Sequence, residues 1–383
     1  MHPKAHQFID HLSHEFRTPL TVIKEFATVL GEGLVGEVNP RQRELLDVVH
    51  DRADDLATMV SDLLDASRLE AGLLGAWRRV VTVADLVQPV HGMLLRKAAV
   101  KKIALRVSLD EGLPEVFCDP DKIGRVIVNL AANAIKFSPE GSEVELWARH
   151  NLEEGEVLVG VTDQGPGLSQ EQISQVFEPF QEADRPGRHA AKGLGLGLSV
   201  ARELASLNLA EIEVQSEPGK GSTFAFGVPE ANPAELAARY LRAMAKSDQD
   251  DPWVTLIAAR LAPPVPPGLS NVIDEFLQHT FRPGSLVYRV LPHSWLILTP
   301  GAELQTQWLL TEARFVWDED GLAASPEGLP SIDYQTQGSW PVKTGASEAV
   351  HEFRRLLPGS PEAPSFPIPL YFAPQGPAVV PTA

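Results

Sequence analysis

Cysteine is almost absent from this chain, and basic residues are in deficit. Cys118 is the single cysteine among 383 residues, which excludes an intrachain disulfide and a cysteine-rich zinc site and favours a reducing cytoplasm. Only 33 Lys and Arg stand against 51 Asp and Glu, so the net charge is −18. Nucleic acid and anionic membranes attract proteins with a basic field, so we expect neither as a partner.

Long apolar runs are missing as well. No stretch reaches the roughly 18 apolar residues that a membrane-spanning helix needs. Polar and charged residues begin almost at Met1, which is unlike a signal peptide. We therefore expect a cytoplasmic protein without membrane insertion. A hydrophobic content of 44% and a charged content of 22% are typical of globular proteins, and the length is enough for two or three domains.

Residues 1–75 predict a helical hairpin. Helical periodicity covers residues 4–31 and 41–72, and the segment between them carries Gly and Asn-Pro turn signals. Two such helices cannot bury both of their apolar stripes against each other. We expect a homodimer whose two hairpins form a four-helix bundle. The alternative is that the stripe packs against the next domain of the same chain.

The first helix carries His14, Glu15 and Thr18 directly before Pro19. Neutral imidazole is a nucleophile near pH 7. Glu15 could accept its proton, and Thr18, one turn after His14, could orient a water molecule on the same helix face. This run alone is a weak signal, because a lone histidine on a helix is usually a surface residue.

Residues 80–230 predict a layered α/β domain. Strand-like stretches alternate with helical segments, and one predicted helix places Asn129, Asn133 and Lys136 on one face at i, i+4 and i+7. Amide oxygens can ligate Mg²⁺, and an ammonium group can contact phosphates. A polar helix face without a ligand is the alternative.

Two glycine-rich segments follow in the same domain. Asp163, Gly165 and Gly167 come directly after a predicted strand, where a carboxylate can accept from an adenine amino group and glycines allow a close approach. A second set opens a helix, where backbone N–H groups form an anion nest; its glycines are Gly193, Gly195 and Gly197. Between the two sets lie Phe177 and Phe180 and then a polar loop, residues 181–192. Thr223 lies on the last predicted strand.

Each motif is weak alone, but their order resembles that of the bacterial two-component sensor histidine kinases. The resemblance covers about residues 4–230, and its boxes are Phe8–Leu20, Asn129–Phe137, Asp163–Gly167, Phe177–Phe180 and Gly193–Leu198. It implies a domain of the gyrase and Hsp90 type, an α/β sandwich that binds ATP, with Mg²⁺ on Asn133 and with Asn129 and Lys136 facing the phosphates. Asp163 would bind the adenine amino group beside Gly165 and Gly167, and Thr223 would support the adenine site. Phe177 and Phe180 would precede the ATP lid, which Gly193, Gly195 and Gly197 would hinge.

The resemblance also implies an activity. His14 would be the phosphoacceptor, Glu15 the general base, and Thr18 the residue that supports phosphatase activity toward a response regulator. The enzyme would be a protein-histidine kinase that autophosphorylates on His14 from ATP and passes the phosphoryl group to a response-regulator aspartate. A scaffold that uses ATP only as a conformational signal is the alternative. Only 13 residues precede His14, so we expect that the input comes from the C-terminal part or from a separate sensor protein, or that the chain is a fragment.

One departure from the family is visible. The paired glycine that usually precedes the next strand is replaced by Asn208-Leu209-Ala210. A tight left-handed turn is less favourable without glycine, so we expect the turn to differ.

The C-terminal part predicts a helical linker (231–250), an α+β domain (251–357) and a tail (358–383) with eight prolines that favours an extended or disordered chain. The β-α-β-β-α-β order of residues 251–357 predicts a ferredoxin-like fold. The unit is also weakly similar to diguanylate cyclase domains, but its hairpin at Leu291–Trp295 lacks the acids that would hold two metal ions. It is then either a degenerate, regulatory relative of those cyclases or a generic interaction domain.

Overall fold

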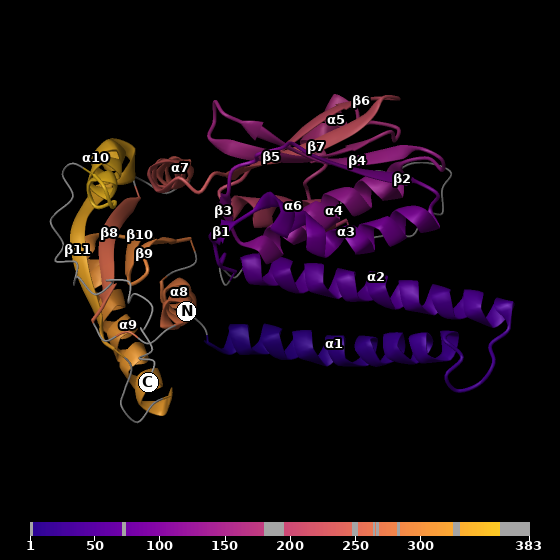
Figure 1. Ribbon diagram of the computed structural model, residues 1–383, viewed down its shortest axis with the longest axis horizontal. Coiled ribbons are helices and arrows are strands. Elements are labelled where there is room, and N and C mark those ends of the chain that lie inside the picture. Colours follow the sequence, from indigo (N-terminus) through magenta and orange to yellow (C-terminus); the bar gives the residue numbers. More distant parts are fainter. Residues whose placement is uncertain are drawn as a thin grey trace, which may run out of the picture.

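The computed structural model describes residues 3–70, 74–179, 195–246, 252–262, 265, 268–281, 284–324 and 330–360. Within this part the chain forms a helical hairpin, a domain stacked on the hairpin, and a second sheet at one end (Figure 1). Two predicted site residues, Phe180 and Gly193, lie outside the described residues, and so does the proline-rich tail from residue 361.

The hairpin consists of α1 (Pro3–Gly31) and α2 (Pro40–Glu70), within two residues of the predicted bounds. Asn39 and Gln42 exchange hydrogen bonds at the start of α2, where backbone N–H groups lack helical partners. Leu20, Ala27 and Leu64 are buried, but most large apolar side chains of the hairpin are exposed. These are Phe16, Val22, Ile23, Phe26, Leu30, Leu34, Val35, Leu45, Val48, Val49, Leu56 and Leu63.

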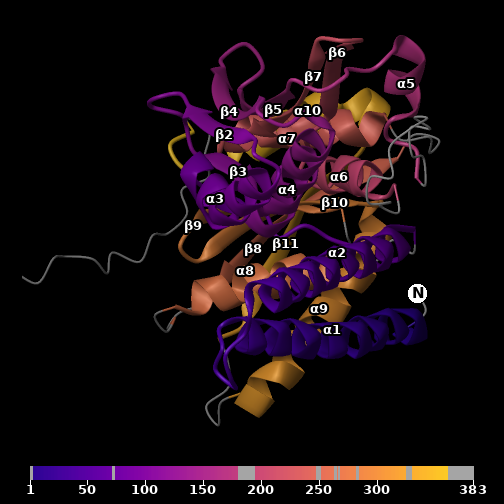
Figure 2. The ribbon, with the colours of Figure 1, turned by 90° about the vertical axis from the view of Figure 1, so that its right-hand side faces the viewer.

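The second unit is a five-stranded sheet in the order β2-β4-β5-β7-β6, with three helices on one face. The β2–β4 pair is parallel and the other pairs are antiparallel. Figures 1 and 2 show α3, α4 and α6 between this sheet and α2. The strands are β2 (Ala104–Leu109), β4 (Glu143–Asn151), β5 (Glu156–Asp163), β6 (Ile212–Glu217) and β7 (Gly221–Pro229). The helices are α3 (Val83–Val100), α4 (Pro120–Phe137), α5 (Gln170–Gln175) and α6 (Gly197–Ser206).

Capping residues fix both ends of α4. The carboxylate of Asp119 accepts a hydrogen bond from the backbone N–H of Lys122, and Pro120 takes the first helical position, where no donor is needed. At the other end the ammonium group of Lys101 donates to the carbonyls of Ile135 and Ser138. A cation at this end also offsets the helix dipole. Two short strands that the sequence pattern did not reveal, β1 (Arg79–Val81) and β3 (Val116–Cys118), pair beside the start of this helix.

The third unit is a four-stranded antiparallel sheet in the order β11-β8-β10-β9. Its elements are β8 (Trp253–Leu261), α8 (Leu269–Thr280), β9 (Leu286–Leu291), β10 (Ser294–Pro300), α9 (Glu303–Ala324), β11 (Ile332–Pro341) and α10 (Val342–Arg355). The predicted β-α-β-β-α-β order is present. Helices α8 and α9 share one buried cluster with Ile257 and Ala259 of β8, so both helices cover the same face.

The predicted linker is part of this third unit. Helix α7 (Pro233–Ala245) buries Leu236 and Tyr240 in one cluster with α10 and with Leu256 of β8. Because residues alternate along a strand, Leu256 faces α7 while its neighbour Ile257 faces α8 and α9. Phe117 of β3 joins the same cluster. The second and third units are therefore packed together through a common core.

Candidate functional site

The face of α4 that carries the predicted phosphate ligands meets the start of α6. The side-chain amide of Asn129 donates a 3.0 Å hydrogen bond to the carbonyl of Gly197. Asn133 lies one turn further along and is partly exposed, and Lys136 is exposed near the end of the helix. Among the described residues the side-chain amide of Asn133 has no hydrogen-bond partner, so its oxygen is available to a ligand.

The carboxylate of Asp163 ends β5 and is buried. Its Oδ1 accepts a 2.7 Å hydrogen bond from the backbone N–H of Gly165. A Cβ on Gly165 would lie 2.7 Å from this Oδ1, so a larger residue would displace the carboxylate. Gly167 has φ +66°, and a Cβ there would lie 2.0 Å from the carbonyl oxygen of Glu217. These glycines therefore do more than form a turn, because they let the backbone of this segment pack closely against neighbouring backbone.

Thr223 is not brought to this side of the sheet, which corrects the prediction. Strand β7 pairs with β5 so that Thr223 lies opposite Thr162 and Ser222 lies opposite Asp163. The hydroxyl of Thr223 lies 3.0 Å from that of Thr162, and Thr162 accepts from the indole of Trp147 on the far face. Ser222 is the buried hydroxyl beside Asp163. Motif matching missed it, whereas the period of two along a strand would have found it.

Phe177 anchors the chain just before the segment that was predicted as the lid. Its ring meets Phe224 of β7 edge-on, with the ring centroids 6.4 Å apart, and the guanidinium of Arg202 lies 5.6 Å from the Phe177 centroid. On the other side of that segment, Gly195 has φ +66° and Leu196 is buried directly before α6. Both ends of the predicted lid are thus fixed to the helical layer.

The predicted phosphoacceptor run lies within α1. The helix includes His14 and continues through Pro19 without a break in assignment. Glu15 and Thr18 are exposed, whereas the side chain of His14 is outside the described part of the structure.

The described residues contain no group of three or more His, Cys, Asp or Glu that could hold a metal ion. A Mg²⁺ ion bound with a nucleotide needs less, because phosphate oxygens and water supply most of its ligands. The amide oxygen of Asn133, one turn from both Asn129 and Lys136, fits that requirement. Among the described helices none is long and apolar enough to cross a membrane.

The fold and the site define a class of protein: a helical hairpin whose first helix carries a histidine motif, joined to a layered α/β domain. Residues 4–72 match the family model of the His Kinase A (phospho-acceptor) domain. Residues 118–232 match the model of the histidine kinase-, DNA gyrase B- and HSP90-like ATPase. The chain therefore contains the two domains, phosphoacceptor and ATPase, that these family models describe.

Two curated histidine kinases are similar in sequence to this chain. The circadian input-output histidine kinase CikA of Synechococcus elongatus is 32% identical over 58% of this chain, and histidine protein kinase DivJ of Caulobacter vibrioides is 31% identical over 58%. The matched region spans only 30% and 37% of the length of these two relatives. The crystal structure of full-length ShkA in complex with AMPPNP is 29% identical, with a TM-score of 0.47, over 61% of this chain and 48% of that one.

Proposed function

We propose that this protein is an ATP-dependent kinase that phosphorylates its own His14 and then passes the phosphoryl group to an aspartate of a response regulator. The observation that carries the proposal is the presence, in one chain, of the phosphoacceptor hairpin and of an ATPase domain in which Asn129 bonds directly to the carbonyl of Gly197. That bond joins the asparagine-bearing face of α4 to the glycine-rich start of α6. ATP would lie against both.

Each predicted site residue then has a role in binding. Asp163 accepts from the adenine amino group, and Gly165 and Gly167 keep the backbone close to the ring. Lys136 contacts the phosphates, together with the backbone N–H groups at the start of α6. Mg²⁺, held in part by the amide oxygen of Asn133, supplies neutralisation of phosphate charge.

Phosphoryl transfer forms one bond and breaks another. A ring nitrogen of neutral His14 attacks the γ-phosphorus in line, the bond from that phosphorus to the bridging oxygen breaks, and ADP leaves with the electron pair. Glu15 takes up the proton that the imidazole loses as its positive charge develops. Catalysis comes chiefly from positioning and charge neutralisation.

Three finer assignments extend the proposal. Thr18, one turn after His14, would orient a water molecule toward the phosphorylated regulator, which gives phosphatase activity. The exposed apolar side chains of α1 and α2 support a homodimer in which two hairpins form a four-helix bundle. Residues 251–357 form a ferredoxin-like interaction domain, supported by the antiparallel order β11-β8-β10-β9 with α8 and α9 on one face.

The decisive experiment is labelling with γ-labelled ATP and Mg²⁺ in the full chain. We expect acid-labile, alkali-stable phosphate in the wild-type protein and none in the His14→Ala variant. His11→Ala changes another histidine of the same helix and should label normally. Acid-labile labelling of His14→Ala would refute the assignment of His14, and a wild-type protein that binds ATP without labelling would favour a scaffold.

A further inference from the structure

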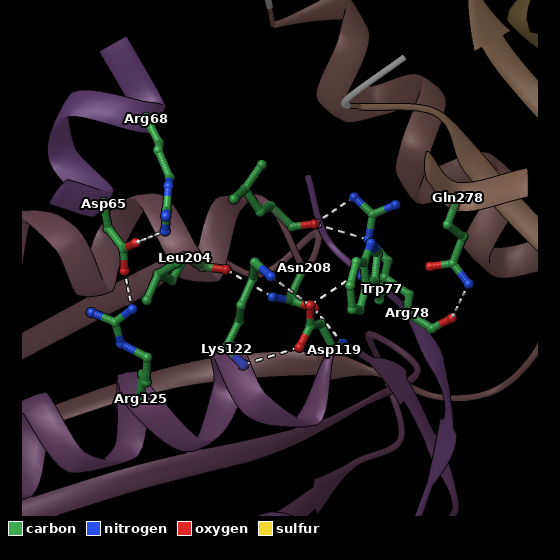
Figure 3. Close-up of polar contacts among 11 residues, drawn as sticks. Asp65, Arg68, Trp77, Arg78, Asp119, Lys122, Arg125, Leu204, Asn208 and Gln278 are labelled. Atoms are coloured by element: carbon green, nitrogen blue, oxygen red, sulfur yellow. Dashed lines mark hydrogen bonds and ion pairs between the residues drawn. The ribbon is translucent and has the colours of Figure 1, made fainter. Parts of the chain in front are cut away.

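The segment between α2 and β1, residues 74–78, is the covalent link between the hairpin and the ATPase domain. In the structure this link is not a free tether. Figure 3 shows that Trp77 and Arg78 contact groups from both the ATPase domain and the C-terminal unit.

Arg78 is the last residue of the link, and its side chain forms hydrogen bonds with the ATPase domain and with the C-terminal unit. Its side chain is 6% exposed. Nε donates a 2.8 Å hydrogen bond to the carbonyl of Leu207, and Nη1 donates a 3.1 Å bond to the carbonyl of Ser285. Leu207 is the C-cap of α6, whereas Ser285 precedes β9. Burial lowers the pKa of Arg78 to about 10, so the guanidinium stays cationic at neutral pH.

Helix α8 of the C-terminal unit holds the same link from the other side. The amide of Gln278 donates to the carbonyl of Arg78 at 3.4 Å. The ring of His279 meets the indole of Trp77 edge-on, with centroids 4.7 Å apart and an interplanar angle of 65°. The backbone N–H of Trp77 in turn donates a 2.9 Å bond to the carboxylate of Asp119, the N-cap of α4.

These contacts connect the link to the nucleotide-binding helices. Asp119 begins α4, whose later turns carry Asn129 and Lys136, and Leu207 ends α6, which starts at Gly197. The link is thus tied to the far ends of the two helices that line the proposed ATP site. A rigid helix transmits a shift at one end to the other.

The ATPase domain is also docked on α2. Asp65 of α2 is buried and pairs with Arg68 of α2 and with Arg125 of α4. Phosphoryl transfer requires the γ-phosphorus and the imidazole nitrogen to approach to about 3–3.5 Å. A rotation of the ATPase domain relative to α1 has to move residues 74–78, and the contacts of α8 with Trp77 and Arg78 resist that movement.

We propose that the C-terminal unit, residues 253–357, is a clamp that restrains this link and so sets the rate at which His14 is phosphorylated. The proposal rests on the proposed kinase function. The unit lies outside both family matches, which end at residue 232. A ligand or partner that shifts α8 away from Trp77 releases the link and raises the rate.

The test uses full-length protein and the initial rate of autophosphorylation. The variants Gln278→Ala and His279→Ala each remove one contact of α8 with the link. We expect each to raise the rate about threefold or more, with the KM for ATP changed by less than twofold, because neither residue touches the nucleotide site. Trp77→Ala should give a similar rise that is not additive with His279→Ala, since the two substitutions break one contact.

Glu275→Ala is the matched control, because Glu275 is exposed on the same helix and forms no hydrogen bond or ion pair with the described residues 74–78. Hydrogen exchange should become faster at residues 74–79 in the His279→Ala variant and stay unchanged in the control. The clamp would be overturned if His279→Ala autophosphorylated no faster than the wild-type protein and if residues 74–79 exchanged hydrogen equally slowly in both. If the wild-type protein itself fails to label, the kinase function fails and not the clamp alone, and the exchange measurement still decides whether α8 holds the link.

Discussion

At the scale of single residues, two glycines have nearly equal φ angles but different surroundings. Replacing each of them with alanine therefore distinguishes the cost of a left-handed backbone from the cost of a steric clash. Gly155 has φ +60° and Gly167 has φ +66°. A Cβ on Gly155 would meet open space, whereas one on Gly167 would lie 2.0 Å from the carbonyl oxygen of Glu217. We expect Gly155→Ala to cost about 1 kcal/mol, from the left-handed backbone alone.

For Gly167→Ala we expect a larger loss, because overpacking adds about 1–3 kcal/mol and the backbone beside Asp163 has to move. Thermal unfolding and ATP titration check both variants. Weaker ATP binding is expected for Gly167→Ala only. Equal melting temperatures for the two variants would show that the contact with Glu217 relaxes freely.

The sequence predicts which types of side chain occur in the site more readily than it predicts the face of a strand on which each side chain lies. Asn129 lies on α4, Asp163 ends β5 and Gly167 takes the left-handed conformation after it, whereas their roles in binding ATP stay predictions. Thr223 was wrong, because a motif match gives no information about which face of a strand a side chain occupies. The register of β5 with β7 decides that, and it places Ser222 beside Asp163.

At the scale of the elements, Asn208 explains how the turn after α6 forms without paired glycines. Leu209 takes the left-handed conformation at φ +58°, which is costly for a side chain of this size. The buried amide of Asn208 offsets that cost, since it accepts a 2.6 Å bond from the N–H of Asp119 and donates a 2.8 Å bond to the carbonyl of Leu204. The left-handed turn is thus kept without its glycines, and the prediction that the turn would differ is wrong.

Replacing this asparagine tests the explanation. Asn208→Ala leaves the N–H of Asp119 buried without an acceptor, which costs about 1–3 kcal/mol. We expect the melting temperature to fall by several degrees. Asn151→Ala removes a longer, partly exposed 3.4 Å bond to Glu156 and serves as the control. A similar melting temperature for both variants would contradict the account.

The positions of most helices and strands along the chain followed from the periodicity of apolar residues. Their neighbours in the fold did not. The hairpin helices and the seven elements of the third unit were predictable because each has a long apolar pattern of its own period. Strands β1 and β3 have three residues each, too few for a pattern. The role of α7 was missed because an apolar stripe on a helix shows that this face is buried, but does not show which element buries it.

At the scale of the whole molecule, the exposed apolar stripe of α1 predicts the oligomeric state. Phe26 is 63% exposed, and Ile23 and Leu30 on the same face are exposed as well. We expect Phe26→Glu to weaken dimerisation at least tenfold, because burial of a phenylalanine stabilises by about 1.5–3 kcal/mol and a buried carboxylate destabilises.

Sedimentation velocity of the full chain at micromolar concentration measures this change. Thr28→Glu introduces the same charge at an exposed position on another face of α1 and should leave the dimer intact. A Phe26→Glu variant that sediments like the wild-type protein would favour the other interpretation, in which the stripe is covered within one chain.

The position of α7 also bears on how this protein can be divided and recombined. A fragment that starts at residue 251 would carry the four-stranded sheet but leave Leu256 and Phe353 without the helix that covers them. A fragment that starts at Asn232, the N-cap of α7, keeps that helix. The exchangeable module, for swapping or for recombinant expression, therefore begins where the ATPase match ends, before α7, and not after that helix.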